Sequence, residues 1–419
     1  MARSINKEVT CPFCSLLCDD LVVEHKQGHL TVREHGCSRA RSCFERPAAN
    51  PAPAIRGMEV SLDKAIGEAA RLLGGARRPL ISGLGSDVAG SRAAMPLAER
   101  TKAVLDHCLG EAAVRNILVL QERGWITTTL TEVKNRADFI LFVGTDAVSR
   151  YPRFFERYVW NKSSLFLEKG TERNIAYLGR RLNTRPGISP AGVRPLNIHC
   201  ETEELAGYLS LLLALMKGLE LQPESIPRRK QAQLRTLGQQ LREANYGVVV
   251  WAPGDLDVAH GELIVEAAGE VIRELNHSGR CAGLPLAGDH GTASFMNTCA
   301  WQSGYPLRVS YERGFPEHNT YKYATERLLR RQQVDVLFWI AGFGLEPPVP
   351  ETDLPTIVLG VSPPEQEADV FIPVGTPGLD HAGTLFRTDS VVALPLKALR
   401  STGLPSVATV LERIIGALP

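Results

Sequence analysis

The chain has 419 residues, enough for two or three domains with a large hydrophobic core. Its formal net charge is +1 and its charged fraction is 22%, which indicates neither a basic nucleic-acid-binding stripe nor an acidic tail. No apolar run approaches the roughly 20 residues that span a bilayer, and the N-terminus lacks the apolar core of a signal peptide. We therefore expect a cytoplasmic protein that binds neither nucleic acid nor membrane.

Four of the nine cysteines follow one pattern near the N-terminus, C-x2-C-x3-C-x18-C, formed by Cys11, Cys14, Cys18 and Cys37. Clustered thiols in a cytosolic chain indicate metal binding more often than disulfides. A 4Fe–4S cluster needs four thiolates, whereas structural zinc pairs a close cysteine knuckle with a distant one. The x3 gap favours an iron–sulfur cluster over zinc. An empty, vestigial ligand set is the third alternative.

Residues 1–55 are predicted to form a small unit around these cysteines. The segment 21–35 predicts two strands that turn at Lys26-Gln27-Gly28 and bring Cys37 back to the first three cysteines. A proline-rich linker over 46–57 then ends the unit.

From residue 58 onward, apolar strand-like runs alternate with amphipathic helical segments, which predicts an α/β fold with parallel sheets covered on both faces. We see no internal repeat. Helices are expected over 61–73, 91–108, 201–218, 224–245, 261–276 and 406–418. Strands are expected within 78–86, 137–152, 163–170, 246–255, 334–342, 354–360 and 368–374.

Two long segments, 288–320 and 378–395, show little periodicity. Long irregular segments in α/β proteins tend to be binding loops. For the first segment, the alternative is that Trp301, Tyr305 and Tyr311 pack a domain interface. The scattered cysteines are expected to be buried apolar residues, and they are Cys108, Cys200, Cys281 and Cys299.

The order of these motifs resembles the B subunit of formylmethanofuran dehydrogenase and of its bacterial relative, the formyltransferase/hydrolase complex of one-carbon metabolism. The resemblance covers nearly the whole chain. Its segments are CPFCSLLCDDLVVE, ISGLG, LFVGTDAVSRYPRFFERY, WQSGYPLRVSYERGFPEHN and PGLDHAGTLFRTDSVVALPLKAL.

The resemblance implies a molybdopterin-oxidoreductase-like fold: a Cys-rich cluster domain with two Rossmann-like parallel-sheet domains and no C-terminal β-barrel domain. The implied division is residues 1–55 for the Cys-rich domain and linker, 56–112 with 285–419 for a discontinuous α/β domain, and 113–284 for an inserted α/β domain. A separate subunit supplies the β-barrel in this family, so a partner chain is implied.

The sequence departs from the dehydrogenases where their tungsten or molybdenum is bound. We place the metal-binding thiol of that family in the loop between the ISGLG strand and the next helix, here residues 83–95. That loop contains no cysteine; it offers Ser86, Asp87 and Ser91, whose hard oxygen atoms replace a soft thiolate poorly. We therefore expect at most one 4Fe–4S cluster, held by the four N-terminal cysteines, and no molybdenum- or tungsten-pterin.

Three functions compete. The first is a non-redox structural subunit, without a catalytic site of its own, of a formyltransferase/hydrolase complex that converts formyl-tetrahydromethanopterin to formate through a methanofuran-type carrier. Its partners would be subunits of the A, C and D type. The second is the catalytic subunit of a tungsten- or molybdenum-pterin formylmethanofuran dehydrogenase. The third is an iron–sulfur protein that keeps only its cluster. The thiol-free 83–95 loop favours the first over the second.

Overall fold

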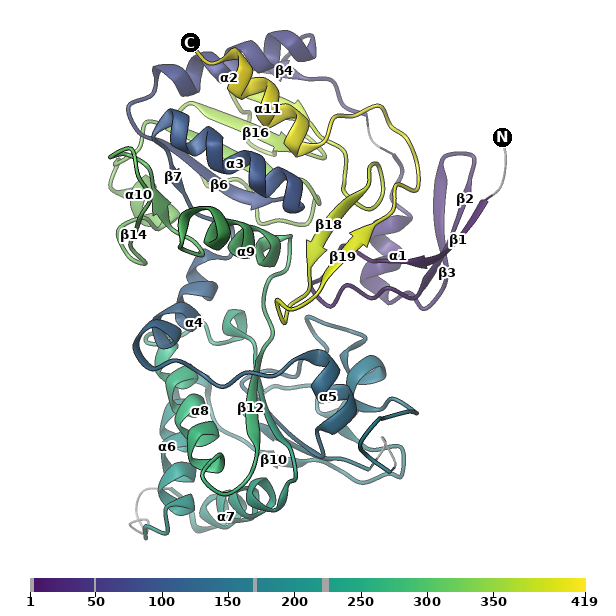
Figure 1. The fold of residues 1–419 in the computed structure, drawn as a ribbon, viewed down its shortest axis with the longest axis vertical. Helices are drawn as coiled ribbons and strands as arrows, with labels where there is room; N and C mark the ends of the chain where they lie inside the picture. Colours follow the sequence, from purple (N-terminus) through teal and green to yellow (C-terminus); the bar gives the residue numbers. More distant parts are fainter. Residues whose placement is uncertain (1–3, 49, 169–171, 221–225) are drawn as a thin grey trace. The chain divides into compact units, whose positions relative to one another are not determined.

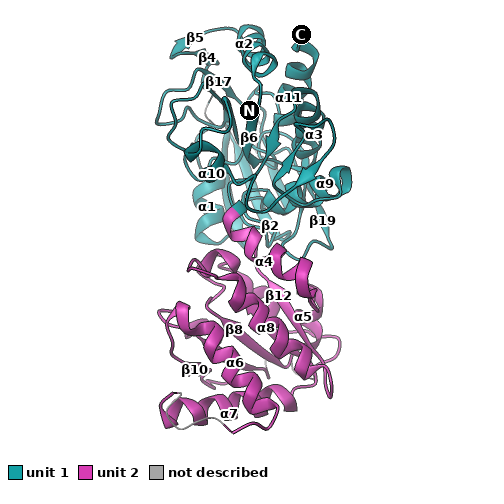
Figure 2. Ribbon diagram, turned by 90° about the vertical axis from the view of Figure 1, so that its left-hand side faces the viewer, with its two compact units in different colours: residues 1–110, 288–419 teal, residues 111–287 magenta. Residues whose placement is uncertain are grey.

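The structure is a computed structural model that describes residues 4–48, 50–168, 172–220 and 226–419. The chain divides into two compact units: residues 1–110 with 288–419 form unit 1, and residues 111–287 form unit 2 (Figure 1, Figure 2). Unit 1 is discontinuous in sequence because unit 2 is inserted within it. No helix in the described ranges is long and apolar enough to cross a membrane.

Unit 1 begins with a three-stranded antiparallel sheet, β1 (Ser4–Val9), β2 (Leu21–Lys26) and β3 (His29–Glu34), followed by the helix α1 (Ser38–Phe44). The β2–β3 hairpin turns at Gln27 and Gly28, which both have positive φ, 51° and 82°, as tight hairpin turns require. The predicted hairpin is therefore confirmed. Because β3 runs antiparallel to β2, it returns the chain toward the β1–β2 loop, which holds three of the cysteines.

A nine-stranded mixed sheet forms the body of unit 1, in the order β14-β13-β7-β6-β15-β16-β17-β4-β5. Its four central parallel strands are almost fully buried, as their continuous apolar sequences predict. Helix α11 packs against α2 and α3, and α3 packs against α9 (Figure 1). The bounds are β4 (Ala54–Ile55), β5 (Met58–Glu59), α2 (Leu62–Gly75), β6 (Pro79–Gly85), α3 (Val88–Thr101), β7 (Val104–Leu105), α9 (Thr292–Ser303), β13 (Val309–Ser310), β14 (Glu317–His318), α10 (Thr325–Arg330), β15 (Val336–Ala341), β16 (Thr356–Gly360), β17 (Val370–Pro373), β18 (Gly383–Phe386), β19 (Ala393–Leu396) and α11 (Val407–Ala417).

Unit 2 is built on a five-stranded, wholly parallel sheet in the order β10-β9-β8-β11-β12. Helix α6 packs against both α7 and α8, and the three helices share one apolar core with the sheet. The coarse prediction of an α/β fold with parallel sheets is confirmed in both units. The bounds are α4 (Gly110–Arg123), α5 (Leu130–Arg136), β8 (Phe139–Val143), β9 (Asn174–Leu178), β10 (Leu196–Ile198), α6 (Leu205–Met216), α7 (Arg228–Glu243), β11 (Gly247–Trp251), α8 (Glu262–Leu275) and β12 (Cys281–Pro285), with short turns η1 (Phe155–Val159), η2 (Arg185–Gly187), η3 (Thr202–Glu204) and η4 (Pro253–Asp255).

Two predicted elements are wrong. Residues 163–168 form no strand, since the Ser164 hydroxyl and the Leu165 amide bond to Asn135 instead of a sheet neighbour, at 2.8 and 3.2 Å; residues 169–170 of that prediction lie outside the described residues. The helix expected over 91–108 ends at Thr101, because Lys102 adopts the left-handed conformation (φ 55°) that commonly ends helices.

The segment 288–320 is less irregular than expected, because α9 occupies residues 292–303. Helix α9 buries six of its residues, on more than one side, and so lacks an amphipathic stripe. Small and polar residues fill much of its sequence, which hides it from an analysis based on periodicity.

Candidate functional site

The four cysteines predicted to bind metal lie together in the N-terminal part of unit 1. Cys11, Cys14 and Cys18 occupy the β1–β2 loop, which the Cys11 amide closes by donating to the Cys18 carbonyl at 2.8 Å. Cys37 caps α1, where its Sγ accepts a bond from the Ala40 amide at 3.4 Å. The first three side chains are buried and Cys37 is half-buried, and within the described residues none of the four is in a disulfide bond.

Electrostatics place the four thiols in one neighbourhood. Burial raises the pKa of Cys11 well above its ordinary value, and the nearby Cys14, Cys18 and Cys37 raise it further. Burial likewise raises the pKa of Cys14, with Asp289 and Cys18 adding to it. Since burial and crowding raise the pKa of Cys11 and Cys14, these thiols become stable thiolates only if a cation compensates their charge.

Zinc and a 4Fe–4S cluster require different distances between their ligand sulfur atoms. Zinc binds sulfur at about 2.3 Å, which puts tetrahedral ligands about 3.8 Å from one another. Within the described residues, no three of the four sulfur atoms of Cys11, Cys14, Cys18 and Cys37 lie within 4.8 Å of one another. A cluster of four iron atoms holds its thiolates farther apart than one ion does. Four cysteine thiolates are the donor set that a 4Fe–4S cluster uses.

Asp289 anchors the cysteine loop on the body of unit 1. Its Oδ1 accepts bonds from the amide and the hydroxyl of Ser15, at 2.9 and 3.2 Å. Arg39 on α1 faces the other carboxylate oxygen at 3.8 Å, and the Thr388 amide donates to the Ser15 carbonyl at 2.8 Å. Sequence analysis missed Asp289, because it is 274 residues away from Ser15 and belongs to no motif.

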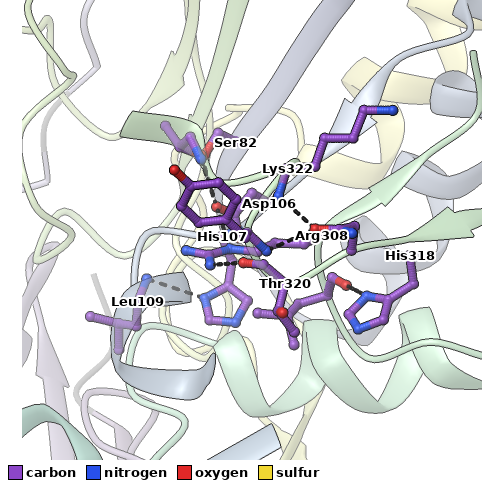
Figure 3. Close-up of polar contacts among 12 residues, drawn as sticks. Ser82, Asp106, His107, Leu109, Arg308, His318, Thr320 and Lys322 are labelled. Atoms are coloured by element: carbon purple, nitrogen blue, oxygen red, sulfur yellow. Dashed lines mark hydrogen bonds and ion pairs between the residues drawn. The ribbon is translucent and has the colours of Figure 1, made fainter. Parts of the chain in front are cut away.

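A buried ion pair lies where β7 ends in unit 1. Asp106 and Arg308 are only 1% and 2% exposed, and their Oδ2 and Nε atoms lie 3.4 Å apart. The same Asp106 oxygen accepts from the amide and hydroxyl of Thr325, at 2.9 and 3.1 Å. Figure 3 shows the Arg308 guanidinium between Asp106 and Thr320, whose carbonyl accepts its second bond.

His107 is the residue after Asp106, and its imidazole ring is neutral. Its Nδ1 accepts from the Leu109 amide at 3.1 Å (Figure 3), so its proton resides on Nε2, which is buried and has no hydrogen-bond partner among the described residues. The ring meets the Phe295 ring edge-on, with centroids 5.8 Å apart. Burial, with a smaller effect of the Arg308 charge, lowers the pKa of His107 to about 3.

Cys108 is the thiol at this end of the sheet, and sequence analysis misjudged its setting. It is half-buried, and its amide donates to the Gly83 carbonyl at 3.0 Å. Burial raises its pKa well above the ordinary value, and the Glu346 and Asp106 carboxylates raise it further. Burial also raises the pKa of Glu346 to about 7. Cys108 is therefore a protonated thiol among carboxyl groups, whereas Cys200, Cys281 and Cys299 are buried as expected.

In the loop singled out for its lack of thiols, residues 83–95, two of the three oxygen-bearing side chains have structural roles. The third, the buried Ser91 hydroxyl, has no hydrogen-bond partner among the described residues. Asp87 caps α3 by accepting a bond from the Gly90 amide at 3.0 Å, and Ser86 donates to Asp87 at 3.4 Å. Both side chains are buried, whereas Val88 is half-buried and Ala89 is exposed. The side-chain oxygens of Ser86 and Asp87 therefore form hydrogen bonds at the start of α3.

A pocket of about 1170 Å³ opens at the carboxyl ends of β15 and β16 in unit 1. Parallel α/β sheets bind nucleotide-like cofactors at this edge, and their phosphates are held by basic side chains and free amides. None of the described residues that line this pocket is Lys, Arg or His. Its lining includes five prolines and four acids, Pro347, Pro348, Pro350, Pro363, Pro364, Glu346, Glu351, Asp353 and Glu365.

Fold and site together define an α/β protein, built on parallel sheets, with a cysteine-rich N-terminal module. The chain is 30% identical over 336 residues to the B subunit of the formyltransferase/hydrolase complex of Methylorubrum extorquens, covering 79% of this chain and 87% of that protein. It therefore belongs to the family that comprises this protein and the B subunit of formylmethanofuran dehydrogenase, as the motifs predicted. No model of a known protein family matches the chain.

Two further comparisons agree. The B subunit of the tungsten-containing formylmethanofuran dehydrogenase 2 of Methanocaldococcus jannaschii is 27% identical over 405 residues, which is 92% of each chain. A chain in the crystal structure of the formyltransferase/hydrolase complex from Methylorubrum extorquens, solved with methylofuran, superposes with a TM-score of 0.75. It is 28% identical, and the match covers 88% of this chain and 98% of that one.

We predict that Arg308→Met lowers the free energy of unfolding by about 3 kcal/mol or more, since it leaves the Asp106 carboxylate buried without its partner. Urea unfolding of the purified chain measures this. Arg413→Met is the matched control, because its ion pair with Asp63 is exposed and such pairs contribute about 0–1 kcal/mol. Equal losses in the two variants would contradict the structural importance of the Asp106–Arg308 pair.

The low pKa of His107 makes stability depend on pH. The unfolded chain takes up a proton near pH 6.5 and the folded chain only near 3, so stability is lost as the pH falls below 6.5. Between pH 7 and 5, the wild type should lose about 2 kcal/mol more unfolding free energy than His107→Asn. The exposed His29→Asn serves as a control and should lose as much as the wild type. Identical pH profiles for all three chains would refute the assignment.

Proposed function

We propose that this chain is the non-redox structural B-type subunit of a formyltransferase/hydrolase complex that converts formyl-tetrahydromethanopterin to formate through a methanofuran-type carrier. It would assemble in the cytoplasm with subunits of the A, C and D type, which carry the chemistry. The main support for this proposal is the acidic pocket at the carboxyl ends of β15 and β16. Its carboxylates would repel the phosphate groups of a pterin dinucleotide.

The absence of a suitable metal ligand in residues 83–95 supports the same proposal. The Asp87 carboxylate caps α3, and the exposed Ala89 offers no donor atom. A structural subunit needs the fold and its surfaces, not a tungsten ligand. The similarity to the B subunit of the Methylorubrum complex extends over most of both chains.

The alternative is the catalytic subunit of a tungsten- or molybdenum-pterin dehydrogenase. Two observations favour it: the similarity to a tungsten-containing relative, and Cys108, a soft donor at the end of β7. However, burial, followed by the neighbouring Glu346 and Asp106, raises the pKa of that thiol and keeps it protonated. We therefore rank the structural role first.

We further infer that Cys11, Cys14, Cys18 and Cys37 hold one 4Fe–4S cluster. Such a cluster exchanges one electron at a time when it is bound. In this module it would mainly join the β1–β2 loop to α1, where the small hydrophobic core benefits from a metal crosslink. Spacing, burial and convergence of the four thiols support this assignment.

We also propose that the chain has the domain order of the molybdopterin oxidoreductases. In this order, residues 1–55 form the cluster domain and linker, 56–112 with 285–419 one Rossmann-like domain, and 113–284 the inserted one. The compact units divide the chain after residues 110 and 287, which supports a discontinuous domain around an inserted one.

The structural role predicts that the tagged chain, purified from its native cells, retains three further subunits through gel filtration. Mass spectrometry should identify them as the hydrolase, transferase and remaining subunit of the complex. Metal and pterin analysis of the same preparation should find neither tungsten nor molybdenum. A pterin-bound metal in stoichiometric amount would instead establish the dehydrogenase alternative.

The cluster assignment predicts about four iron atoms and four sulfides per chain in anaerobically purified protein. Cys14→Ser should abolish this content, since the cluster needs all four thiolates. Cys43→Ser is the matched control, because Cys43 is a buried cysteine on α1 that is not in the ligand set. About one zinc per chain, or equal iron loss in both variants, would contradict the assignment.

A further inference from the structure

The segment 301–331 of unit 1 exposes an unusual number of aromatic side chains. Trp301 and Tyr321 are 61% and 68% exposed, and Phe315 and Tyr305 are 54% and 38% exposed. From the sequence, this region is either a binding loop or a segment in which Trp301, Tyr305 and Tyr311 pack a domain interface; of these three, Tyr311 is buried and the other two are exposed. We call the four exposed rings, with Arg313 and Lys322, the aromatic–basic surface.

Internal contacts hold this surface in place. The Tyr305 ring stacks on His318 with centroids 5.2 Å apart, and Trp301 meets Phe386 edge-on at 5.4 Å. The Arg327 guanidinium lies 4.5 Å from the centre of the Tyr321 ring. Strand β14, in the same segment, is at the edge of the nine-stranded sheet (Figure 1).

The buried Asp106–Arg308 pair fixes the base of the segment. Arg308 bonds to the carbonyl of Thr320, next to Tyr321 (Figure 3). The Asn319 side chain accepts bonds from the amides of Tyr321 and Lys322, at 3.0 and 2.7 Å. A surface that is already ordered costs little conformational entropy when a partner binds, so exposed rings held this way favour tight association.

The charge of the segment identifies the kind of partner. Apart from the buried Arg308, residues 301–331 contain five Arg or Lys and three Glu, and Arg313 pairs with Glu317 at 3.2 Å. The whole chain has 47 basic and 46 acidic residues. A symmetric contact between two copies would oppose this positive surface to itself, which like charges disfavour. Interfaces are rich in Trp, Tyr and Arg, so the surface suits a protein with a complementary acidic face.

We propose that the aromatic–basic surface is the docking site for another subunit of the complex, one that presents acidic side chains around apolar pockets for Trp301 and Tyr321. This inference rests on the proposed function, and it names the surface through which the structural role is exercised. The rings supply the buried apolar area, and Arg313 and Lys322 supply the charge complementarity.

The test uses the complete complex, co-expressed with a tagged copy of this chain. Trp301→Ala/Tyr321→Ala removes the rings, and Arg313→Glu/Lys322→Glu reverses the charge. Leu165→Ala/Phe166→Ala and Arg229→Glu/Arg235→Glu are matched controls, because these residues are exposed on unit 2. Melting curves verify that each variant is folded, and the Kd for the remaining subunits is measured at low and high salt.

Each surface variant should weaken binding by about 30-fold or more, the effect of losing interface hot spots, and the charge reversal should also remove the salt dependence. The controls should bind like the wild type. Unchanged binding by folded surface variants would overturn the docking site while leaving the proposed function intact. Self-association of the isolated chain that the ring variant abolishes would overturn it in favour of a second copy. A wild-type chain that binds none of the other subunits would refute the proposed function itself.

Discussion

The ion pair between Asp106 and Arg308 joins parts of unit 1 that are about two hundred residues apart in sequence. Asp106 ends β7, Arg308 precedes β13, and Thr325 begins α10; all three meet at one carboxylate oxygen. Burial alone raises the pKa of Asp106, and the donors around it oppose that shift. The pair is therefore stable only as a complete network, because each donor offsets part of the cost of removing the carboxylate from water. The shape of the 308–325 segment depends on it.

The strands that the sequence predicts well are those whose apolar residues are continuous. Strands β6, β15 and β16 lie in the middle of a parallel sheet, so nearly every side chain is apolar and the pattern is unmistakable. Strand β7 is different, since it has only two residues, Val104 and Leu105. Its position is set by pairing with β6 and β13, and pairing partners are not visible in a local pattern.

The residues of the candidate site likewise differ in whether a local sequence pattern reveals them. Local spacing is enough to single out Cys11, Cys14 and Cys18. Three thiols within eight residues approach one another at a small cost in chain entropy. Spacing gives no hint of Asp289, Cys108 or Glu346. Cys108 and Glu346 follow β7 and β15, parallel strands of one sheet that end at the same edge. Asp289 instead precedes α9 and reaches the cysteine loop through its bonds to Ser15. Asp289 contributes to the electrostatics of Cys14, so even the predicted site is completed by a residue that only tertiary structure reveals.

Acidic and basic side chains occupy different regions of unit 1. At the carboxyl ends of β15 and β16, where an α/β sheet offers a ligand its best position, the pocket lining is rich in carboxylates and prolines. Exposed basic side chains that include Arg313 and Lys322 lie instead on the exterior of the 301–331 segment. Asp106 connects the end of β7 with the 301–331 segment. It precedes His107 and Cys108 in the chain, and it also pairs with Arg308, which bonds to the carbonyl of Thr320 next to the exposed Tyr321. Breaking this network would leave the Asp106 carboxylate buried without its donors, so the stability of unit 1 and the position of the exposed rings depend on the same ion pair.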